Sequence, residues 1–382
     1  MKWKISLSDI DFGEEEITAV TKVLKSKWLT MGEVTQEFEK RFADYLGIKY
    51  AFAVSSGTAA LHIAHQVLGI GKEDKVICPS LTFIATANSI LYTGATPVFA
   101  DITGLDDFNI LPDDIAGKIT PKTKAVTVVH YGGYPCDMNR IMEATKEHNL
   151  YLIEDAAHAV GAEYNGKKCG TIGDIGCFSF FSNKNLVTGE GGMIVTDNDE
   201  FARKIKLLRS HGMTTLTLDR YKGHAHSYDV VELGYNYRTT EISSAIGLVQ
   251  LSKLDKNNRK RREITNQYRE LLGNTLEIQI PFKNSKEKSS CHLFPVLLNK
   301  KISRERFMIG LKEMGIQTSI HYPPAHLFSY YRKRFGFQEG SLPLTEEVGK
   351  REITLPLYPM LSREDIIYIV KTLKEMLSSV GR

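Results

Sequence analysis

A lysine and an aspartate stand in sequence surroundings that suit one defined chemistry. Lys184 lies in a polar turn between the apolar stretch Cys177–Phe181 and a glycine cluster at residues 189–192. Asp155 ends another apolar stretch, Tyr151–Asp155. A lysine amine on a rigid loop can form a Schiff base, and an aspartate at a strand end can keep a pyridinium nitrogen protonated. This pair is typical of enzymes that use pyridoxal phosphate (PLP) as an electron sink.

Each of the two residues also has a simpler interpretation. Most lysines are solvated surface charges. An aspartate after a strand commonly caps a helix or forms a turn. The PLP hypothesis therefore depends on a phosphate site elsewhere in the chain.

Residues 51–61 predict such a phosphate site. An apolar strand leads into a turn of small residues and then into a helix that begins near Thr58. Free backbone amides at the start of a helix, with the hydroxyls of Ser56 and Thr58, can bind an anion, and Gly57 permits close approach. The nucleotide P-loop pattern is absent. A capped helix without a ligand is the alternative.

Three further side chains fall where a phosphorylated pyridine ring would need them. Ser179 precedes Lys184 by five residues and could add a hydroxyl to the phosphate site. Phe83 follows a strand end and could stack on the ring, or it is simply a core residue. His158 could reach the phenolic oxygen of the cofactor, or it caps a helix. Asp155 would lie at the carboxyl edge of the sheet, where open α/β sheets bind ligands.

The elements that must position these residues predict an α/β fold. Short apolar strands alternate with helices, which indicates a largely parallel sheet buried on both faces. The strands on either side of Lys184 leave no room for a helix between them, so this pair is expected to be antiparallel. The expected strands are Tyr50–Val54, Lys75–Cys78, Pro97–Ala100, Lys124–His130, Leu150–Glu154, Cys177–Phe181 and Gly192–Thr196.

Two domains are expected, because 382 residues exceed the usual size of a single core. Residues 1–250 would form a large PLP-binding α/β domain, and residues 251–382 a connecting helix with a small α+β domain. Residues 1–30 could pack on the small domain. The expected helices and strand outside the sheet are residues 13–27, Gln36–Leu46, Ala85–Tyr92, Asp137–Asn149, Thr240–Leu272, Ser303–Met314, Arg363–Leu377 and the strand Gln317–His321.

Composition is that of an ordinary soluble protein, with 42% apolar and 25% charged residues and a net charge of +4. The basic run at residues 256–262 is interpreted as a solvated helix face, so no nucleic-acid partner is expected. Neither a signal peptide nor a membrane span is indicated. Five cysteines without a C-x-x-C pair argue against disulfides and a metal site, and fit the cytoplasm.

Seven short motifs together resemble the DegT/DnrJ/EryC1/StrS family of PLP-dependent sugar aminotransferases. The resemblance spans nearly the whole chain and implies fold type I, the aspartate-aminotransferase-like fold. Phe181–Asn183 departs from the usual family sequence before the lysine, which affects the detail of that loop. The motifs are Lys27–Gly32, Ser55–Leu61, Pro79–Asn88, Glu154–Ala159, Phe178–Leu186, Gly234–Arg238 and His321–Pro324.

The family resemblance also implies a role for each site residue. Lys184 would be the Schiff-base lysine and Asp155 the partner of the pyridinium nitrogen. Phe83 would stack on the ring and His158 would lie beside its oxygen. The residues implied to bind the phosphate are Gly57, Thr58, Ala59 and Ser179.

Two groups of residues would complete the site. The resemblance implies that Asn236 of the partner subunit reaches the phosphate, which would make a homodimer obligatory; by itself Asn236 would be interpreted as a loop former. His321, Tyr322 and Arg238 are candidates for the substrate side, although His321–Pro324 could equally be a structural turn. The stretch Thr214–His226 is either a mobile loop over a diphosphate substrate or an ordinary surface loop.

The implied reaction moves an amino group from an amino acid, L-glutamate, to a keto-sugar that is usually nucleotide-linked. The cofactor would alternate between PLP and pyridoxamine phosphate, with ping-pong kinetics. The product would be an amino sugar for a surface polysaccharide or a glycosylated metabolite. The alternatives are a PLP-dependent sugar dehydratase, disfavoured because that branch carries histidine at the lysine position, and a non-catalytic regulatory protein on the same fold. A nicotinamide-binding protein is not indicated, because G-x-G-x-x-G is absent.

Overall fold

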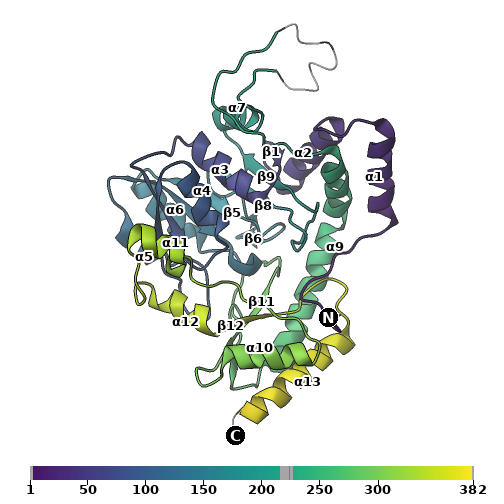
Figure 1. The fold of residues 1–382 in the computed structure, drawn as a ribbon, viewed down its shortest axis with the longest axis vertical. Helices are drawn as coiled ribbons and strands as arrows, with labels where there is room; N and C mark the ends of the chain where they lie inside the picture. The colour runs from purple at the N-terminus through teal and green to yellow at the C-terminus, as the bar shows by residue number, and fades with distance from the viewer. Residues whose placement is uncertain (1–2, 216–222, 224–226, 381–382) are drawn as a thin grey trace.

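The computed structural model describes residues 3–215, 223 and 227–380 (Figure 1). Most of the predicted loop Thr214–His226 therefore lies outside the described residues. None of the helices in the described ranges combines the length and the apolar character that crossing a membrane requires.

A sheet of seven strands forms the centre of the larger part of the molecule, in the order β1-β9-β8-β5-β4-β2-β3. Strands β3, β2, β4, β5 and β8 are parallel to one another, whereas β9 is antiparallel to both β8 and β1. The predictions of a largely parallel sheet and of an antiparallel pair around Lys184 are confirmed. The strands are β1 Tyr50–Val54, β2 Lys75–Pro79, β3 Thr96–Ala100, β4 Thr123–Val129, β5 Tyr151–Asp155, β8 Ile175–Ser179 and β9 Gly192–Thr196.

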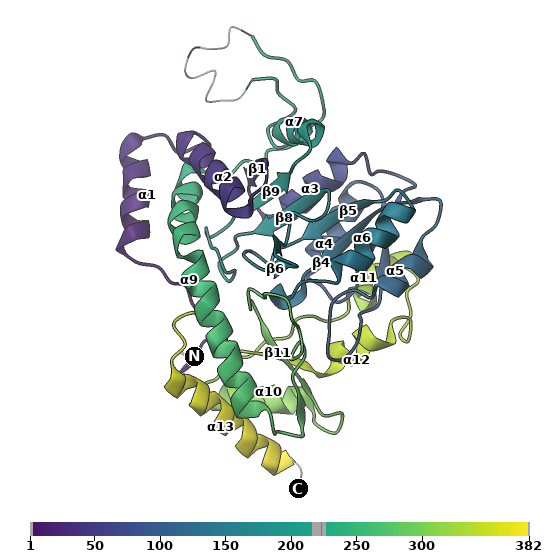
Figure 2. The same cartoon turned by 180° about the vertical axis from the view of Figure 1, so that it is seen from behind.

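Helices cover both faces of this sheet because successive strand residues point to opposite sides. In β2, Val76 and Cys78 pack in one core with α3 (Gly57–Val67) and α4 (Ala85–Tyr92), seen in Figure 1. Ile77 between them packs in another core with α5 (Pro112–Lys118) and α6 (Met138–Glu147), seen from behind in Figure 2. Helix α7 (Asp199–Leu208) follows β9.

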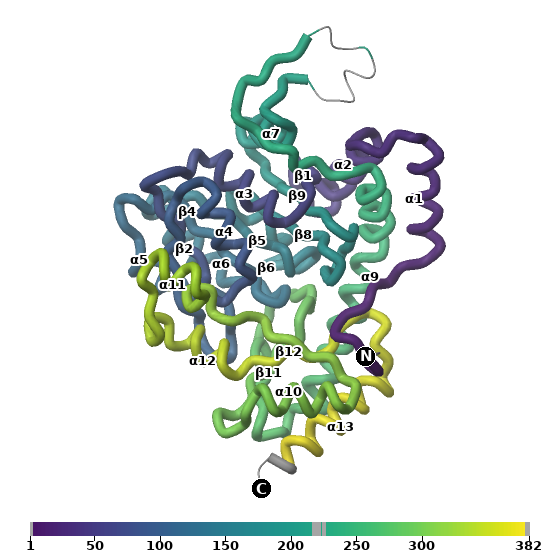
Figure 3. The backbone as a smooth tube through the Cα atoms, viewed as in Figure 1, coloured from purple at the N-terminus to yellow at the C-terminus, as the bar shows by residue number. Residues whose placement is uncertain are grey.

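The β1 end of the sheet is covered by α2 and α9. Helix α2 (Glu33–Leu46) contributes Phe38 and Phe42 to an aromatic core with Phe178 and Phe180, which flank the end of β8. Helix α1 (Glu14–Ser26) packs on the other side of α9 (Glu241–Leu272), as the tube in Figure 3 shows. The predicted domain boundary at residues 250–251 falls inside α9.

Helix α9 makes polar contacts with three distant segments of the chain within one turn. The side chain of Asn258 accepts from Asn185 Nδ2 at 2.8 Å and donates to the carbonyl of Val160 at 2.9 Å. Three residues further on, Arg261 Nη1 donates to the carbonyl of Leu357 at 2.8 Å. These contacts hold the residue after Lys184 and the segment after β12 on the same helix.

The C-terminal part is built on a three-stranded antiparallel sheet, β10-β11-β12. Its core also takes in Ile5 from the N-terminus, and Leu7 N–H donates to Gln317. The strands are β10 Ile278–Gln279, β11 Phe294–Leu298 and β12 Glu352–Leu355, and the helices are α10 Arg304–Glu313, α11 Ser329–Phe335, α12 Pro343–Arg351 and α13 Arg363–Val380. Short elements elsewhere are β6 Glu163–Tyr164, β7 Lys167–Lys168, and the 3-10 turns Tyr131–Gly133 and Ala325–Leu327.

The predicted strand Gln317–His321 is wrong. Within this segment only Ser319 makes a bridge, an isolated one to Thr354, and the preceding Ile316 makes another to Ile5. Beyond Ser319 the ladder stops, because the backbone N–H of His321 donates to the side chain of Glu352 at 2.8 Å. The strand that completes this sheet is β12, which the sequence pattern did not indicate.

Candidate active site

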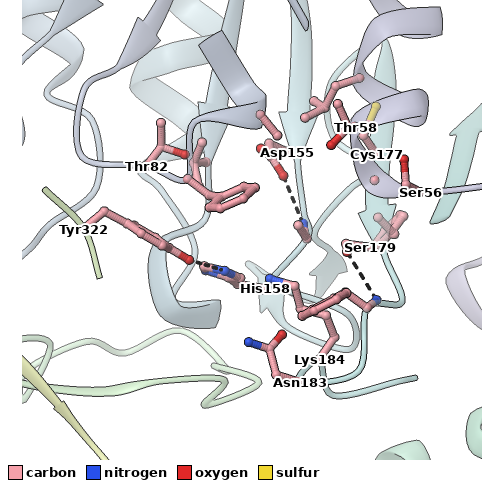
Figure 4. Close-up of a pocket in the computed structure, with 18 of the residues that line it drawn as sticks. Ser56, Thr58, Thr82, Asp155, His158, Cys177, Ser179, Asn183, Lys184 and Tyr322 are labelled. Atoms are coloured by element: carbon pink, nitrogen blue, oxygen red, sulfur yellow. Dashed lines mark hydrogen bonds between the residues drawn. The ribbon is translucent and has the colours of Figure 1, made fainter. Parts of the chain in front are cut away.

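A cavity of about 380 Å³ lies at the carboxyl edge of the large sheet. Asp155 ends β5 and Ser179 ends β8, so two parallel strands deliver their last side chains to one place. Figure 4 shows Asp155, His158, Ser179 and Lys184 facing this space, with Tyr322 approaching from the opposite side. The lining residues are Ser56, Gly57, Thr58, Leu61, Thr82, Phe83, Ala85, Val129, Asp155, Ala157, His158, Cys177, Phe178, Ser179, Phe181, Asn183, Lys184, Glu190, His321 and Tyr322.

The start of α3 forms one wall of the cavity. Ser56 caps this helix by accepting from the N–H of Ala59 at 3.1 Å. Gly57 is required here, because a Cβ on this residue would lie 2.8 Å from Cβ of Ser179. Gly57, Thr58 and Ser179 line the cavity, whereas Ala59 does not, and the N–H of Ala59 donates to Ser56. The helix start and the end of β8 therefore meet as one polar corner.

Lys184 is held in the cavity without a polar partner. Its Nζ makes neither a hydrogen bond nor an ion pair within the described ranges, and burial lowers the pKa of the amine to about 8 although the charge of Asp155 acts in the opposite direction. Among the described lining residues it is also the one lysine or arginine. A partly buried amine with no polar partner and a pKa of about 8 is suited to act as a nucleophile.

The carboxylate of Asp155 is oriented by two donors. Oδ2 accepts from Thr86 Oγ1 at 2.8 Å and Oδ1 from the N–H of Ala157 at 3.2 Å. Burial raises the pKa of Asp155, and these hydrogen bonds together with the charge of Lys184 counteract the rise. A cationic ring nitrogen in the cavity would supply the missing opposite charge. Thr86 was not singled out from the sequence, although its place one turn after Phe83 in Pro79–Asn88 could have indicated it.

His158 is neutral, and its hydrogen bonds fix its tautomer. Burial lowers its pKa well below the ordinary value. Nδ1 lies 3.3 Å from the N–H of Gly132 and must accept from it, so Nε2 carries the proton and donates to Tyr322 Oη at 3.1 Å. The hydroxyl proton of Tyr322 then remains available to a ligand.

Phe83 and His321 complete the opposite wall. The ring of Phe83 is 57% exposed, so it is not the core residue of the simpler interpretation, and its centroid lies 6.1 Å from that of Tyr322. His321 is buried, which lowers its pKa to about 4, and its Nδ1 lies 2.8 Å from Thr354 Oγ1. His321 and Tyr322 thus belong to the same cavity as Lys184.

Asn236 and Arg238 lie away from the cavity of their own chain. Asn236 is exposed and forms a β-bridge with Ser210, whose Oγ accepts from Arg238 at 3.4 Å. Neither residue lines the cavity.

An amine without a polar partner, a carboxylate at a strand end and a helix start around one cavity define a PLP enzyme of the aminotransferase class, and these residues fit that cofactor. Residues 11–374 match the model of the DegT/DnrJ/EryC1/StrS aminotransferase family, and the chain belongs to this family. It is a PLP-dependent aminotransferase of fold type I. The sequence predictions of family, fold, enzyme class and cofactor are confirmed.

The chain is similar to relatives across its whole length. It is 42% identical over 369 residues to the spore coat polysaccharide biosynthesis protein SpsC of Bacillus subtilis, covering 95% of each chain. PseC of Helicobacter pylori, an aminotransferase involved in the biosynthesis of pseudaminic acid, superposes with a TM-score of 0.93 at 31% identity, covering 99% of this chain and 100% of PseC. The PLP form of the putative sugar aminotransferase Spr1654 of Streptococcus pneumoniae gives 0.91 at 30% identity, covering all of both chains.

Proposed function

We propose that this enzyme transfers the amino group of L-glutamate to a nucleotide-linked keto-sugar. The observation that carries the proposal is the amine of Lys184, partly buried and without a polar partner, in one cavity with Asp155. The names of SpsC and PseC, which refer to polysaccharide and pseudaminic acid biosynthesis, support an amino sugar as the product. Such a product would serve a surface polysaccharide or a glycosylated metabolite. The cytoplasm is the expected location, consistent with five cysteines that are all free.

Lys184 would hold the cofactor and then move protons. When bound, PLP supplies an electron sink for the charge that develops as a proton leaves the carbon bearing the amine. With a pKa of about 8, Lys184 has a substantial neutral fraction near physiological pH and can accept that proton and return it. Asp155, fixed by Thr86 and Ala157, would keep the ring nitrogen protonated.

The phosphate would sit in the polar corner of α3 and β8. Gly57, Thr58 and Ser179 line this corner, and Ala59 would support it indirectly through the cap. No arginine lies among the described lining residues, so neutral donors would have to hold a dianion. Asn236 of the partner subunit is proposed as a further donor, which makes the homodimer the active form.

The substrates would enter beside Phe83, His158 and Tyr322. Phe83 is proposed to cover the ring, and His158 to lie near its oxygen. Tyr322 and His321 offer neutral polar groups, which suit the hydroxyls of a sugar better than a charged group. Arg238 of the partner subunit is the proposed cation for an anionic part of a substrate.

The proposal is tested in two steps with purified protein. Borohydride reduction and peptide mass mapping should give a pyridoxyl adduct on Lys184, with Lys184→Met as the control that loses it. Glutamate should then convert the cofactor to its amine form, and a panel of nucleotide keto-sugars should return it to the aldehyde form. An adduct on a different lysine, or a failure of every keto-sugar in the panel, would contradict the proposal.

A further inference from the structure

We propose that Glu352 and Thr354 form a relay that decides which ring nitrogen of His321 carries the proton. His321 would then offer the cavity either a hydrogen-bond acceptor or a donor. The inference rests on the proposed function, because it assigns the relay to the substrate side of that cavity. Glu352 and Thr354 act through His321 and are positioning residues.

The relay is a continuous chain of short hydrogen bonds from β12 to the cavity. Glu352 is fully buried, and its carboxylate accepts from the backbone N–H of His321 at 2.8 Å and from Thr354 Oγ1 at 2.5 Å. Thr354 Oγ1 lies 2.8 Å from Nδ1 of His321. The other ring nitrogen, Nε2, has no hydrogen-bond partner within the described ranges, and the ring lines the cavity.

Only two arrangements use the single proton of the Thr354 hydroxyl in a hydrogen bond to one of its two neighbours, Glu352 and His321. If Glu352 is ionised, Thr354 donates to it and accepts from Nδ1–H, so Nε2 presents a lone pair to the cavity. If Glu352 is protonated, it donates to Thr354, which donates to a bare Nδ1, so Nε2–H points into the cavity. The protonation state of Glu352 therefore decides whether His321 offers the cavity a hydrogen-bond acceptor or a donor.

The two arrangements interconvert by moving protons along the chain of hydrogen bonds. A proton from the cavity binds Nε2, the Nδ1 proton passes to Thr354, and the Thr354 proton passes to Glu352. The reverse sequence returns one proton to the cavity. His321 is neutral at both ends, and no other reactant is needed.

The surroundings leave Glu352 free to adopt either form. Burial raises the pKa of Glu352 to about 8, while the hydrogen bonds from Thr354 and His321 and the charge of Arg304 counteract the rise. Arg304 donates to backbone carbonyls, including that of Glu352, and makes no ion pair with its carboxylate. The other titratable groups that face this carboxyl are the phenols of Tyr131 and Tyr322, and Lys184 acts on His321 from the cavity.

Glu352→Gln gives a specific test, because it should lock one arrangement. The amide oxygen must accept from the N–H of His321, so the amide NH₂ faces Thr354. The Thr354 hydroxyl proton then has Nδ1 as its acceptor, which favours the Nε2–H tautomer. The readout is ¹⁵N NMR of histidine-labelled holoenzyme, with the His321 signals assigned by their loss in His321→Asn. Wild-type His321 should change tautomer as the pH rises through neutrality, and Glu352→Gln should not.

Thr354 provides the matched pair of variants. Thr354→Val removes the link while keeping the shape, and should abolish the tautomer change and slow the keto-sugar half-reaction about tenfold. Thr354→Ser should restore both. Thr265→Val, at a buried hydroxyl without a hydrogen-bond partner, is the control for placing valine in this part of the molecule.

The inference is overturned if His321 of Glu352→Gln changes tautomer with pH as the wild type does. It is equally overturned if Thr354→Val keeps the change or if Thr354→Ser fails to restore it. Because the NMR measurement does not depend on the sugar, these outcomes are distinct from a failure of the proposed function. The latter would appear as a missing adduct on Lys184 or as no accepted keto-sugar.

Discussion

At the end of β5 the large sheet carries two adjacent buried carboxylates, one on each face. They differ in the number of hydrogen-bond donors around them and in the direction of their pKa shift. Glu154 faces away from the cavity and accepts from the ring of His130 and from the backbone N–H groups of Gly170, Ile172 and Gly173. Burial alone would raise the pKa of Glu154, but these donors outweigh it and the pKa is lowered. Asp155 has two donors, and its pKa is raised. A carboxylate with a complete set of donors holds the fold together, and one with an incomplete set is open to a ligand.

The largest expected effect is on activity, from Asp155→Asn. The amide cannot keep a ring nitrogen protonated, so turnover should fall by about a hundred- to a thousandfold. The thermal midpoint of the cofactor-free protein should stay the same or rise, because a buried charge without a cationic partner is removed. Steady-state assays and calorimetry measure the two effects. Asp199→Asn, at an exposed carboxylate, is the control. Near-normal turnover of Asp155→Asn would contradict the difference in role between Asp155 and Glu154.

Glu154→Gln should show the reverse pattern. Its four donors would face an amide instead of a carboxylate, and the free energy of unfolding should fall by about 3 kcal/mol. Turnover per folded molecule should change much less. Urea unfolding measures the loss, with Glu37→Gln, an exposed partner of Arg41, as the control that changes little. A large loss of turnover with unchanged stability would contradict the structural role that we assign to Glu154.

The pH dependence of stability follows from the same carboxylate. Because the folded-state pKa of Glu154 is lowered, its contribution is fully present above its unfolded pKa near 4.5 and is lost as the pH falls through the folded value. Glu154→Gln should therefore differ from wild type at neutral pH and converge with it in acid. Unfolding curves that stay equally far apart at all pH values would contradict this.

The smallest effect is expected from Thr86→Val, which sharpens the comparison by removing one of the two donors to Asp155. Turnover should fall about tenfold, the size of one lost hydrogen bond to a charged group. Thr86→Ser keeps the hydroxyl and should retain most of the activity. The assay is the glutamate half-reaction, in which only the cofactor and the donor take part. Equal rates for the valine and serine variants would exclude a role for the hydroxyl.

The chemistry of the site could be predicted because its residues stand next to local signals. Asp155 ends an apolar strand, Lys184 and Thr58 each come shortly after one, and the carboxyl ends of neighbouring parallel strands meet at one edge. Ala59 could not be placed so well, because its N–H is taken by the Ser56 side chain, a detail of the cap geometry. The roles of Asn236 and Arg238 stay predictions, since neither residue lines the cavity of its own chain.

The C-terminal part was less predictable because its pairing depends on contacts between distant residues. Gln317–His321 has the composition of a strand, but Glu352 takes the N–H that a ladder would need. Nothing local marks Glu352, which looks like an ordinary charged residue near the end of a helix. Only the fold brings it to His321.

Helix α9 has a consequence for how the two walls of the active site are spaced. Asn258 bonds to Asn185, which follows Lys184, and Arg261 bonds to Leu357, which follows the strand that bears Thr354. These two contacts are three residues apart, about 4.5 Å along the helix axis. The distance between the loop that bears Lys184 and the side of the cavity that bears His321 therefore depends on a single rigid turn of α9.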